Sequence, residues 1–201
     1  MEERMNKVER LESMLKKNEE FVAKGEGKKF KASKFSNKNM LVITCMDARL
    51  IKMLPEALDL KNGDANIIKT AGALVCAKSE NVLRSILVSV YELGVEEIFV
   101  VGHYDCGMAG FCCDNLLEKW KDRSDIQQGV QQLSNEGVNF ERWLKGFDHV
   151  EDSVKDSVSF LHEYPLLPQG IKIHGLIINP EDGRVDHVTS LTKEEKIERT
   201  F

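Results

Sequence analysis

The stretch that decides the fold spans residues 41–49 and reads Leu-Val-Ile-Thr-Cys-Met-Asp-Ala-Arg. Its first four residues are apolar or β-branched, a composition typical of a buried strand. Because side chains alternate along a strand, we expect Cys45, Asp47 and Arg49 to point to one face where the strand ends. Burial of a core does not require an acid–base pair beside a cysteine. The stretch therefore indicates a site in which Cys45 is a thiolate metal ligand and Asp47 works beside the metal, held by Arg49.

A second stretch, residues 97–107, ends in a similar way. Residues 97–102 are expected to form another buried strand, His103 follows, and Cys106 lies three residues further on. In an open α/β sheet, ligands bind at the carboxyl ends of the strands. Cys45, His103 and Cys106 would supply two thiolates and one imidazole and leave a fourth position free. This is the pattern of a catalytic rather than a structural zinc site, and soft sulfur ligands favour zinc.

The rest of the chain alternates strands and helices, which predicts an α/β fold with a mostly parallel sheet flanked by helices. The connection before the last strand has about five residues, too few for a parallel crossover, so an antiparallel edge strand is expected. Residues 121–140 are polar and rich in glutamine, and fit either a helical excursion or a mobile loop. Strands are expected at about 39–45, 65–69, 97–102, 171–178 and 184–189, and helices at 55–58, 79–93, 107–120, 150–161 and 192–199.

The N-terminal residues 3–24 read as an amphipathic helix. Val8, Leu11, Leu15 and Val22 share one stripe, while lysine and glutamate occupy the other positions. Glycines end this helix, and a basic, polar connector follows. We therefore expect residues 1–37 to form an N-terminal helical arm with its connector, and residues 38–201 to form a zinc-binding α/β catalytic domain.

Composition restricts the class of protein. The chain has 201 residues, of which 42% are hydrophobic and 30% charged, as in a soluble globular protein. A formal charge of −5 argues against nucleic acid or an anionic membrane as a partner, and no apolar run approaches the ~20 residues of a membrane span. Five cysteines cannot all pair internally, and no secretory signal is visible. A cytoplasmic location is expected, where free thiols and metal ligands outrank disulfides.

The two motifs resemble those of the β-class carbonic anhydrases. Cys-x-Asp-x-Arg stands at residues 45–49 and His-x-x-Cys-Gly at 103–107, and the segments 63–72 and 173–185 agree in order and spacing. The resemblance covers roughly residues 38 to 190 and is stronger to the compact prokaryotic branch than to the plant-like one. One departure is Thr70, where the family usually has asparagine in an Asn-Ala-Gly segment.

The resemblance implies one Zn²⁺ per chain and the reversible hydration of carbon dioxide to bicarbonate and a proton. Zinc lowers the pKa of bound water, so that zinc-bound hydroxide attacks the small-molecule substrate. Asp47 would orient this water, and Arg49 would hold Asp47 off the metal. Gly72, on the loop after the second strand, would border the substrate pocket. The helix at 3–24 could pack on its own domain, but the resemblance implies a homodimer or a dimer of dimers in which it is laid across the partner subunit.

Two other interpretations stay open. A hydrolase of the same fold could use the same ligands on carbon disulfide or carbonyl sulfide and differ only in access to the pocket. A non-catalytic, zinc-bound bicarbonate sensor or regulatory subunit is a third interpretation. The presence of both Asp47 and Arg49 argues against it, since a protein that only binds does not need a pair that orients water.

Overall fold

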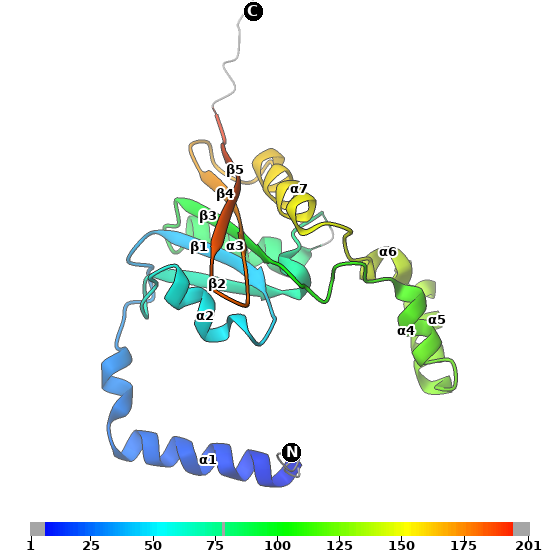
Figure 1. Cartoon of the computed structure of the whole chain (residues 1–201), viewed down its shortest axis with the longest axis horizontal. Helices are drawn as coiled ribbons and strands as arrows, with labels where there is room; N and C mark the ends of the chain where they lie inside the picture. The colour runs from blue at the N-terminus through cyan, green and yellow to red at the C-terminus, as the bar shows by residue number, and fades with distance from the viewer. Residues whose placement is uncertain (1–6, 78, 195–201) are drawn as a thin grey trace, which may run out of the picture. The chain divides into compact units, whose positions relative to one another are not determined.

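A computed structural model describes residues 7–77 and 79–194 (Figure 1). The chain divides into two compact units, Met1–Lys34 and Phe35–Phe201. The assignment of an arm up to residue 37 and a catalytic domain from residue 38 stays a prediction. The helix expected at 192–199 falls largely on residues outside the described part. None of the described helices is long and apolar enough to cross a membrane.

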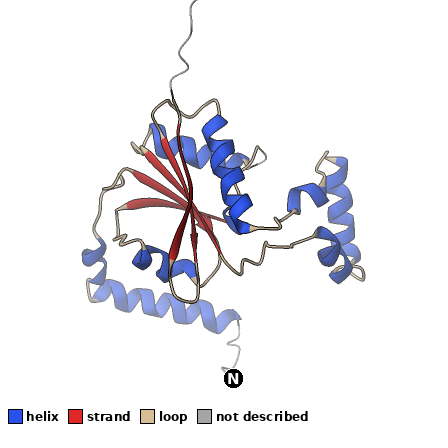
Figure 2. Ribbon diagram, turned by 45° about the horizontal axis from the view of Figure 1, so that its top comes forward, coloured by secondary structure: helices blue, strands red, loops and turns tan. Residues whose placement is uncertain are grey.

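The second unit is built on a five-stranded sheet with the order β2-β1-β3-β4-β5 (Figure 2). The first four strands in this order pair in parallel, and β5 pairs antiparallel with β4, which confirms the predicted α/β sheet and its edge strand. The strands are β1 (Met40–Cys45), β2 (Ala65–Thr70), β3 (Glu97–His103), β4 (Lys172–Ile178) and β5 (Val185–Thr192).

The chain runs outward from β1 to β2 on one side and then continues with β3 on the other side. The strand order therefore reverses between β1 and β3, and the crevice outside the carboxyl ends of two such strands is where open α/β sheets bind ligands. In the parallel register Thr44 of β1 lies beside Val101 of β3, and the Thr44 hydroxyl donates to the Val101 carbonyl at 3.0 Å. Cys45 and His103 are the last residues of these neighbouring strands.

Helices cover both faces of the sheet (Figure 2). Leu41 and Ile43 of β1 belong to a buried cluster with α3 and α7, whereas Val42 belongs to a second cluster with α2. Every residue of β1 is buried, as expected for a central strand with an apolar sequence. The helices are α1 (Lys7–Ala23), α2 (Leu50–Ala57), α3 (Glu80–Tyr91), α4 (Cys113–Lys119), α5 (Ser124–Asn135), α6 (Phe140–Leu144) and α7 (Val150–Glu163).

Two helices differ from the sequence expectation. The helix expected to start at Pro55 begins at Leu50, with Pro55 inside it, because Leu50 and Leu54 lie one turn apart and both bury their side chains. The helix expected over residues 107–120 covers only α4, and turns precede it. Residues 121–140, expected to be either a helical excursion or a mobile loop, form α5 and the start of α6.

The first unit holds α1 and a 3₁₀ helix, η1 (Glu26–Phe30). Within this unit the rings of Phe21 and Phe30 stack with centroids 6.2 Å apart. Other apolar side chains of α1 are exposed within this unit. More than half of the surface of each is exposed at Leu11, Met14, Leu15 and Val22.

Helix α7 packs closely on the sheet because β3 has a glycine beneath it. A Cβ atom at Gly102 would lie 2.8 Å from a methyl carbon of Val150 and 2.8 Å from one of Val154. Real Cβ contacts are not that short, so any larger side chain would push α7 away from β3. Gly102 directly precedes His103, which connects this packing to the end of the strand where the ligands lie.

We predict that Gly102→Ala lowers the free energy of unfolding by about 1–3 kcal/mol, since the extra methyl group overpacks the α7 contact. Chemical denaturation followed by circular dichroism measures the change. Gly129→Ala is the control, because Gly129 lies in α5 and its added Cβ would meet no neighbouring side chain within 4 Å. Alanine is more favourable than glycine in a helix by about 0.5–1 kcal/mol, so this variant should not be destabilised. Equal stability of the Gly102 variant and the wild-type protein would contradict this account of the packing.

Candidate metal centre

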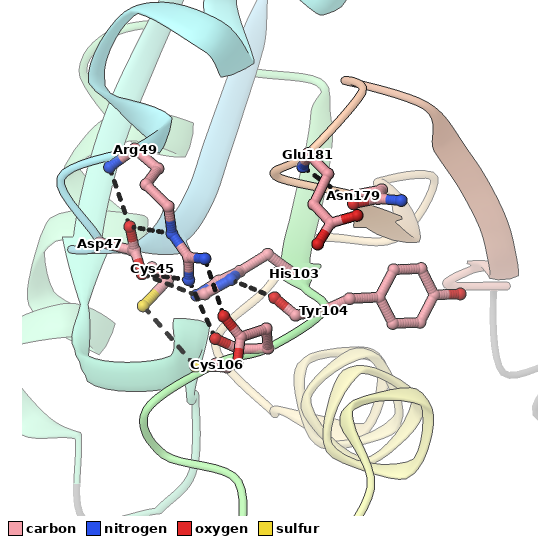
Figure 3. A network of polar contacts seen from close by, with 9 residues as sticks. Cys45, Asp47, Arg49, His103, Tyr104, Cys106, Asn179 and Glu181 are labelled. Carbon is pink, nitrogen blue, oxygen red and sulfur yellow. Dashed lines mark hydrogen bonds and ion pairs between the residues drawn. The ribbon is translucent and has the colours of Figure 1, made fainter.

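Three potential metal ligands meet at the carboxyl ends of β1 and β3 (Figure 3). Cys45 ends β1, His103 ends β3, and Cys106 lies in the turn that follows, where its carbonyl accepts from the Ala109 amide at 2.9 Å. The donor atoms of the three side chains all lie within 4.8 Å of one another, and all three residues are buried. Among the described residues, Cys45, His103 and Cys106 are the one cluster of three potential ligands close enough together to hold a metal ion.

The two sulfur atoms have the separation expected of ligands to a single ion. Cys45 Sγ and Cys106 Sγ are 3.9 Å apart, and both cysteines are free. A disulfide would require ~2.05 Å. Two sulfurs each ~2.3 Å from a tetrahedral metal would be ~3.8 Å apart. The pair therefore fits a shared metal rather than a crosslink.

The imidazole of His103 is oriented so that one nitrogen remains available. Its Nδ1 lies 2.8 Å from the Tyr104 carbonyl oxygen, an acceptor, so Nδ1 carries the proton and donates. The buried Nε2 has no hydrogen-bond partner among the described residues. A buried nitrogen left without a partner normally costs stability. A metal held jointly with the two sulfurs would satisfy its lone pair.

Charges within the cluster favour one thiolate in the metal-free protein. The thiol of Cys106 and, less strongly, the imidazole of His103 lower the pKa of Cys45 to about 4, against the opposing effect of burial. The pKa of Cys106 moves upward, because its proton is shared with Cys45 and burial disfavours a second thiolate. Burial opposes protonation of His103, but the neighbouring Cys45 and the Tyr104 carbonyl outweigh it and raise the pKa of His103.

Asp47 and Arg49 form an ion pair beside the three ligands. Arg49 donates from Nε to Asp47 Oδ1 at 3.1 Å and from a terminal nitrogen to Oδ2 at 2.9 Å, and the Arg49 amide donates to Oδ1 at 2.8 Å. These bonds hold the pKa of Asp47 at about 2, well below its usual range. Asp47 Oδ2 lies 3.9 Å from His103 Nε2, so the carboxylate faces the position where a metal would bind.

The side chains of Cys45, Asp47 and Arg49 converge, but not for the reason expected. The strand ends at Cys45, and Arg49 already has helical backbone angles at the start of α2. Alternation along a strand therefore does not bring Asp47 and Arg49 together. The turn between β1 and α2 does so, since the Asp47 carboxylate accepts from the amide two residues further on.

Gly72 lies in the 3₁₀ turn η2 (Ala71–Ala73) after β2 and is buried. Its φ is +72°, and a Cβ atom there would come within 3.0 Å of both Met108 and Phe147. The backbone of Gly72 also helps to lower the pKa of Cys45, which places this turn next to the cluster. The nearby Thr70 hydroxyl is buried without a hydrogen-bond partner among the described residues.

Asp105 is the residue of this region that the sequence did not assign. It lies between His103 and Cys106, and it does not cap a helix, because α4 begins only at Cys113. Asp105 instead accepts from Arg49, at 2.8 Å on its carboxylate and at 2.9 Å on its carbonyl. The two residues are 56 positions apart, so spacing along the chain gave no signal.

Comparisons with known proteins agree with this site. A family model described as carbonic anhydrase matches residues 40–185. The Bacillus subtilis protein named "Putative carbonic anhydrase YvdA" is 44% identical over 184 residues, which cover 92% of this chain and 93% of that protein. A carbon disulfide hydrolase from Acidithiobacillus thiooxidans is 27% identical over 158 residues, which cover 75% of this chain and 77% of that protein.

Solved structures point to the same family. The crystal structure of β-carbonic anhydrase isoform I from Trichomonas vaginalis has a TM-score of 0.76 and 31% sequence identity. The match covers 92% of this chain and 98% of that one. The β-class resemblance of the two motifs is thereby confirmed.

We predict that metal binding to the cluster releases protons and weakens as the pH falls. At neutral pH Cys45 is already a thiolate, because its pKa lies at about 4, whereas Cys106 must lose its proton to become a ligand. His103, whose pKa is raised, must also lose a proton when the pH lies below that pKa. The affinity for Zn²⁺ should therefore drop about tenfold per pH unit for each proton released as the pH is lowered.

Calorimetry in buffers of different ionisation enthalpy measures the proton release directly. Cys106→Ser is the paired variant, since its hydroxyl stays protonated and is a poor ligand; it should lose most of the metal by elemental analysis. Cys76→Ser is the control, because the exposed Cys76 lies outside the cluster. Full metal occupancy in the Cys106 variant would rule out the ligand set.

Proposed function

The chain belongs to the carbonic anhydrase family, and on that premise we propose that it catalyses the reversible hydration of carbon dioxide to bicarbonate and a proton. The observation that carries the proposal is the buried Nε2 of His103, which has no hydrogen-bond partner among the described residues and lies near two thiol sulfurs and the carboxylate of Asp47. A stopped-flow assay of carbon dioxide hydration on the zinc-loaded protein tests it. The third interpretation, a non-catalytic bicarbonate regulator, predicts binding without turnover.

Cys45, His103 and Cys106 would hold one Zn²⁺ per chain. Two thiolates and one imidazole form a soft donor set that suits zinc, and three protein ligands leave a position for substrate water. When bound, zinc supplies a Lewis acid that brings the pKa of a water molecule close to neutrality. Two thiolates donate more negative charge than neutral imidazoles would, so the remaining residues have to assist the reaction.

Asp47 is suited to orient the attacking water. Its pKa of about 2 keeps it ionised at neutral pH, so it offers only acceptor oxygens. A water that donates to Asp47 Oδ2 turns a lone pair toward the carbon atom of the substrate. The same low pKa prevents Asp47 from retaining the released proton, which passes to solvent or buffer. Asp47 thus acts by orientation and not as the final base.

Arg49 keeps Asp47 in this role. Its planar guanidinium binds both carboxylate oxygens at once, and this paired geometry fixes the carboxylate plane. If the pair opened, Asp47 could rotate onto the metal as a fourth ligand and close the site. Gly72 would border the substrate pocket, because its backbone lies next to Cys45.

A second candidate activity is hydrolysis of carbon disulfide or carbonyl sulfide. A relative that matches three quarters of this chain is named a carbon disulfide hydrolase, and such an enzyme could use the same ligands. Higher identity to the relative named "Putative carbonic anhydrase YvdA" favours carbon dioxide as the substrate. Parallel assays of bicarbonate formation and of hydrogen sulfide release from carbon disulfide separate the two activities.

The cytoplasm remains our proposed location, since all five cysteines are free thiols.

For the assembly, we infer a homodimer or a dimer of dimers in which α1 packs on a partner subunit. The helix exposes an apolar stripe that water would otherwise contact, and monomeric proteins seldom leave such a stripe open. A second copy of the chain provides apolar cover of the same composition, and closed symmetric pairs are the commonest assembly.

We predict that Arg49→Ala keeps the zinc content but lowers kcat/KM for hydration about 10–100-fold, because Asp47 is no longer held for its hydrogen bond to water. Asp47→Asn should lower it for a different reason, the weaker acceptor, and the two losses should not add since both act through one carboxylate. Arg123→Ala is the control, as Arg123 makes the same two-bond pair with Asp125 beside α5. Full activity of the Arg49 variant at neutral and alkaline pH would show that the pair is only structural.

We predict that removal of residues 1–27 shifts the protein to smaller species in multi-angle light scattering, since the apolar stripe of α1 is lost. The double variant Leu11→Ser/Leu15→Ser should have the same effect with the chain length intact. The matched control Glu12→Ser/Lys16→Ser changes the polar side of the same helix and should not alter the mass. A truncated protein that stays a dimer with full activity would show that α1 is dispensable for assembly.

A further inference from the structure

We propose that Asp105 is a positioning residue that fixes the guanidinium of Arg49 and thereby keeps Asp47 in place; this inference rests on the proposed function. The guanidinium of Arg49 donates to two aspartates, Asp47 and Asp105. One edge, Nε and a terminal nitrogen, donates to Asp47. The terminal nitrogen that does not contact Asp47 donates to the Asp105 carboxylate at 2.8 Å. The terminal nitrogen that donates to Asp47 also donates to the Asp105 carbonyl at 2.9 Å.

Two anchored edges restrict motions that one edge leaves free. A guanidinium bound only by Asp47 can still swing together with that carboxylate, because both side chains lie on the same short turn, residues 46–49. Asp105 belongs to a different segment, the turn after β3. A planar group held from two separate segments cannot rotate or translate without breaking a hydrogen bond. Asp105 therefore converts a local pair into a connection between the two turns that form the site.

The backbone of Asp105 is built for this contact. Its φ is +51°, in the left-handed region that aspartate, asparagine and glycine tolerate better than other residues. In this conformation both its carbonyl and its carboxylate reach Arg49. The next residue is Cys106, so one turn supplies a metal ligand and the second anchor of Arg49.

Exposure distinguishes the two anchors. The side chain of Asp47 is 20% exposed, that of Arg49 41%, and that of Asp105 85%. Water and salt screen an ion pair at such an exposed carboxylate, so its contribution is modest. The inner pair with Asp47 is the stronger one, and Asp105 adds orientation to it. We therefore expect a partial loss of rate when Asp105 is changed, smaller than the loss caused by Arg49→Ala.

The test compares Asp105→Asn and Asp105→Gly, which remove the charge or the whole side chain while tolerating the left-handed backbone. We expect zinc content to stay at the wild-type level and kcat/KM to fall about three- to tenfold. Reaction of Arg49 with phenylglyoxal, followed by peptide mass spectrometry on the metal-free and the zinc-loaded protein, should become faster in both variants. This reagent reports how firmly Arg49 is held, independently of any activity.

Asp59 provides matched controls, because it is exposed and also has a positive φ, +47°. Asp59→Asn and Asp59→Gly likewise remove the charge or the whole side chain, but outside the Arg49 network. They should leave the activity and the Arg49 labelling unaltered. In the Arg49→Ala background, Asp105→Asn should cause no further loss, since its effect passes through Arg49.

Three results would overturn the inference: Asp105 variants that match the Asp59 controls in both measurements, variants with higher activity, or an equal further loss in the Arg49→Ala background. If the wild-type protein hydrates no carbon dioxide, the proposed function fails. The phenylglyoxal rates then still decide whether Asp105 holds Arg49. Failure of the inference with an active wild-type protein leaves the proposed function standing.

Discussion

The parallel pairing of β1 with β3 is the constraint on which the rest of the site depends. The register that sets Thr44 beside Val101 makes the two strands end close together, and the Thr44 hydroxyl bond to the Val101 carbonyl lies inside the sheet where water does not compete. Cys45 and His103 are then neighbours without any contribution from the loops. A slip of one residue between these strands would turn either side chain to the other face. The apolar residues of β1 oppose such a slip, because they fill clusters on both faces.

The sequence predicted the parts of the structure that depend on local pattern. Residues 41–45 are recognisable as a buried strand because apolar and β-branched residues fill most of them, and the order of strands and helices implies the parallel sheet. Prediction was wrong where packing overrode a local signal. Pro55 suggested a helix start, but burial of Leu50 and Leu54 stabilises a helix that begins earlier. The expected helix at 107–120 is shortened to α4, since residues 107–110 form turns and an isolated bridge that pairs Ala109 with Phe147.

The same division holds within the site. The three possible metal ligands could be picked out from the sequence because thiols and an imidazole at strand ends are chemically unusual. The contact between Arg49 and Asp105 could not, because it joins two turns that only the sheet brings together. The pairing of Asp47 with Arg49 lies between these cases. The residues were recognisable, but the strand geometry used to explain their convergence was incorrect, and a turn stabilised by the Asp47 carboxylate takes its place.

These contacts separate the site into two layers with different physical properties. The inner layer of Cys45, His103 and Cys106 is buried, so its electrostatic interactions are strong and its geometry is set by the strands. The outer layer, Arg49 with its two aspartates, is progressively exposed toward Asp105, so water and salt weaken the bond to Asp105 more than the bonds to Asp47. Metal affinity should therefore depend mainly on the fold, whereas the orientation of water should depend on three side chains at the surface. Substitutions in the outer layer could tune the rate or the substrate preference of such a site without loss of the metal, which is a physical reason why one fold can carry related reactions.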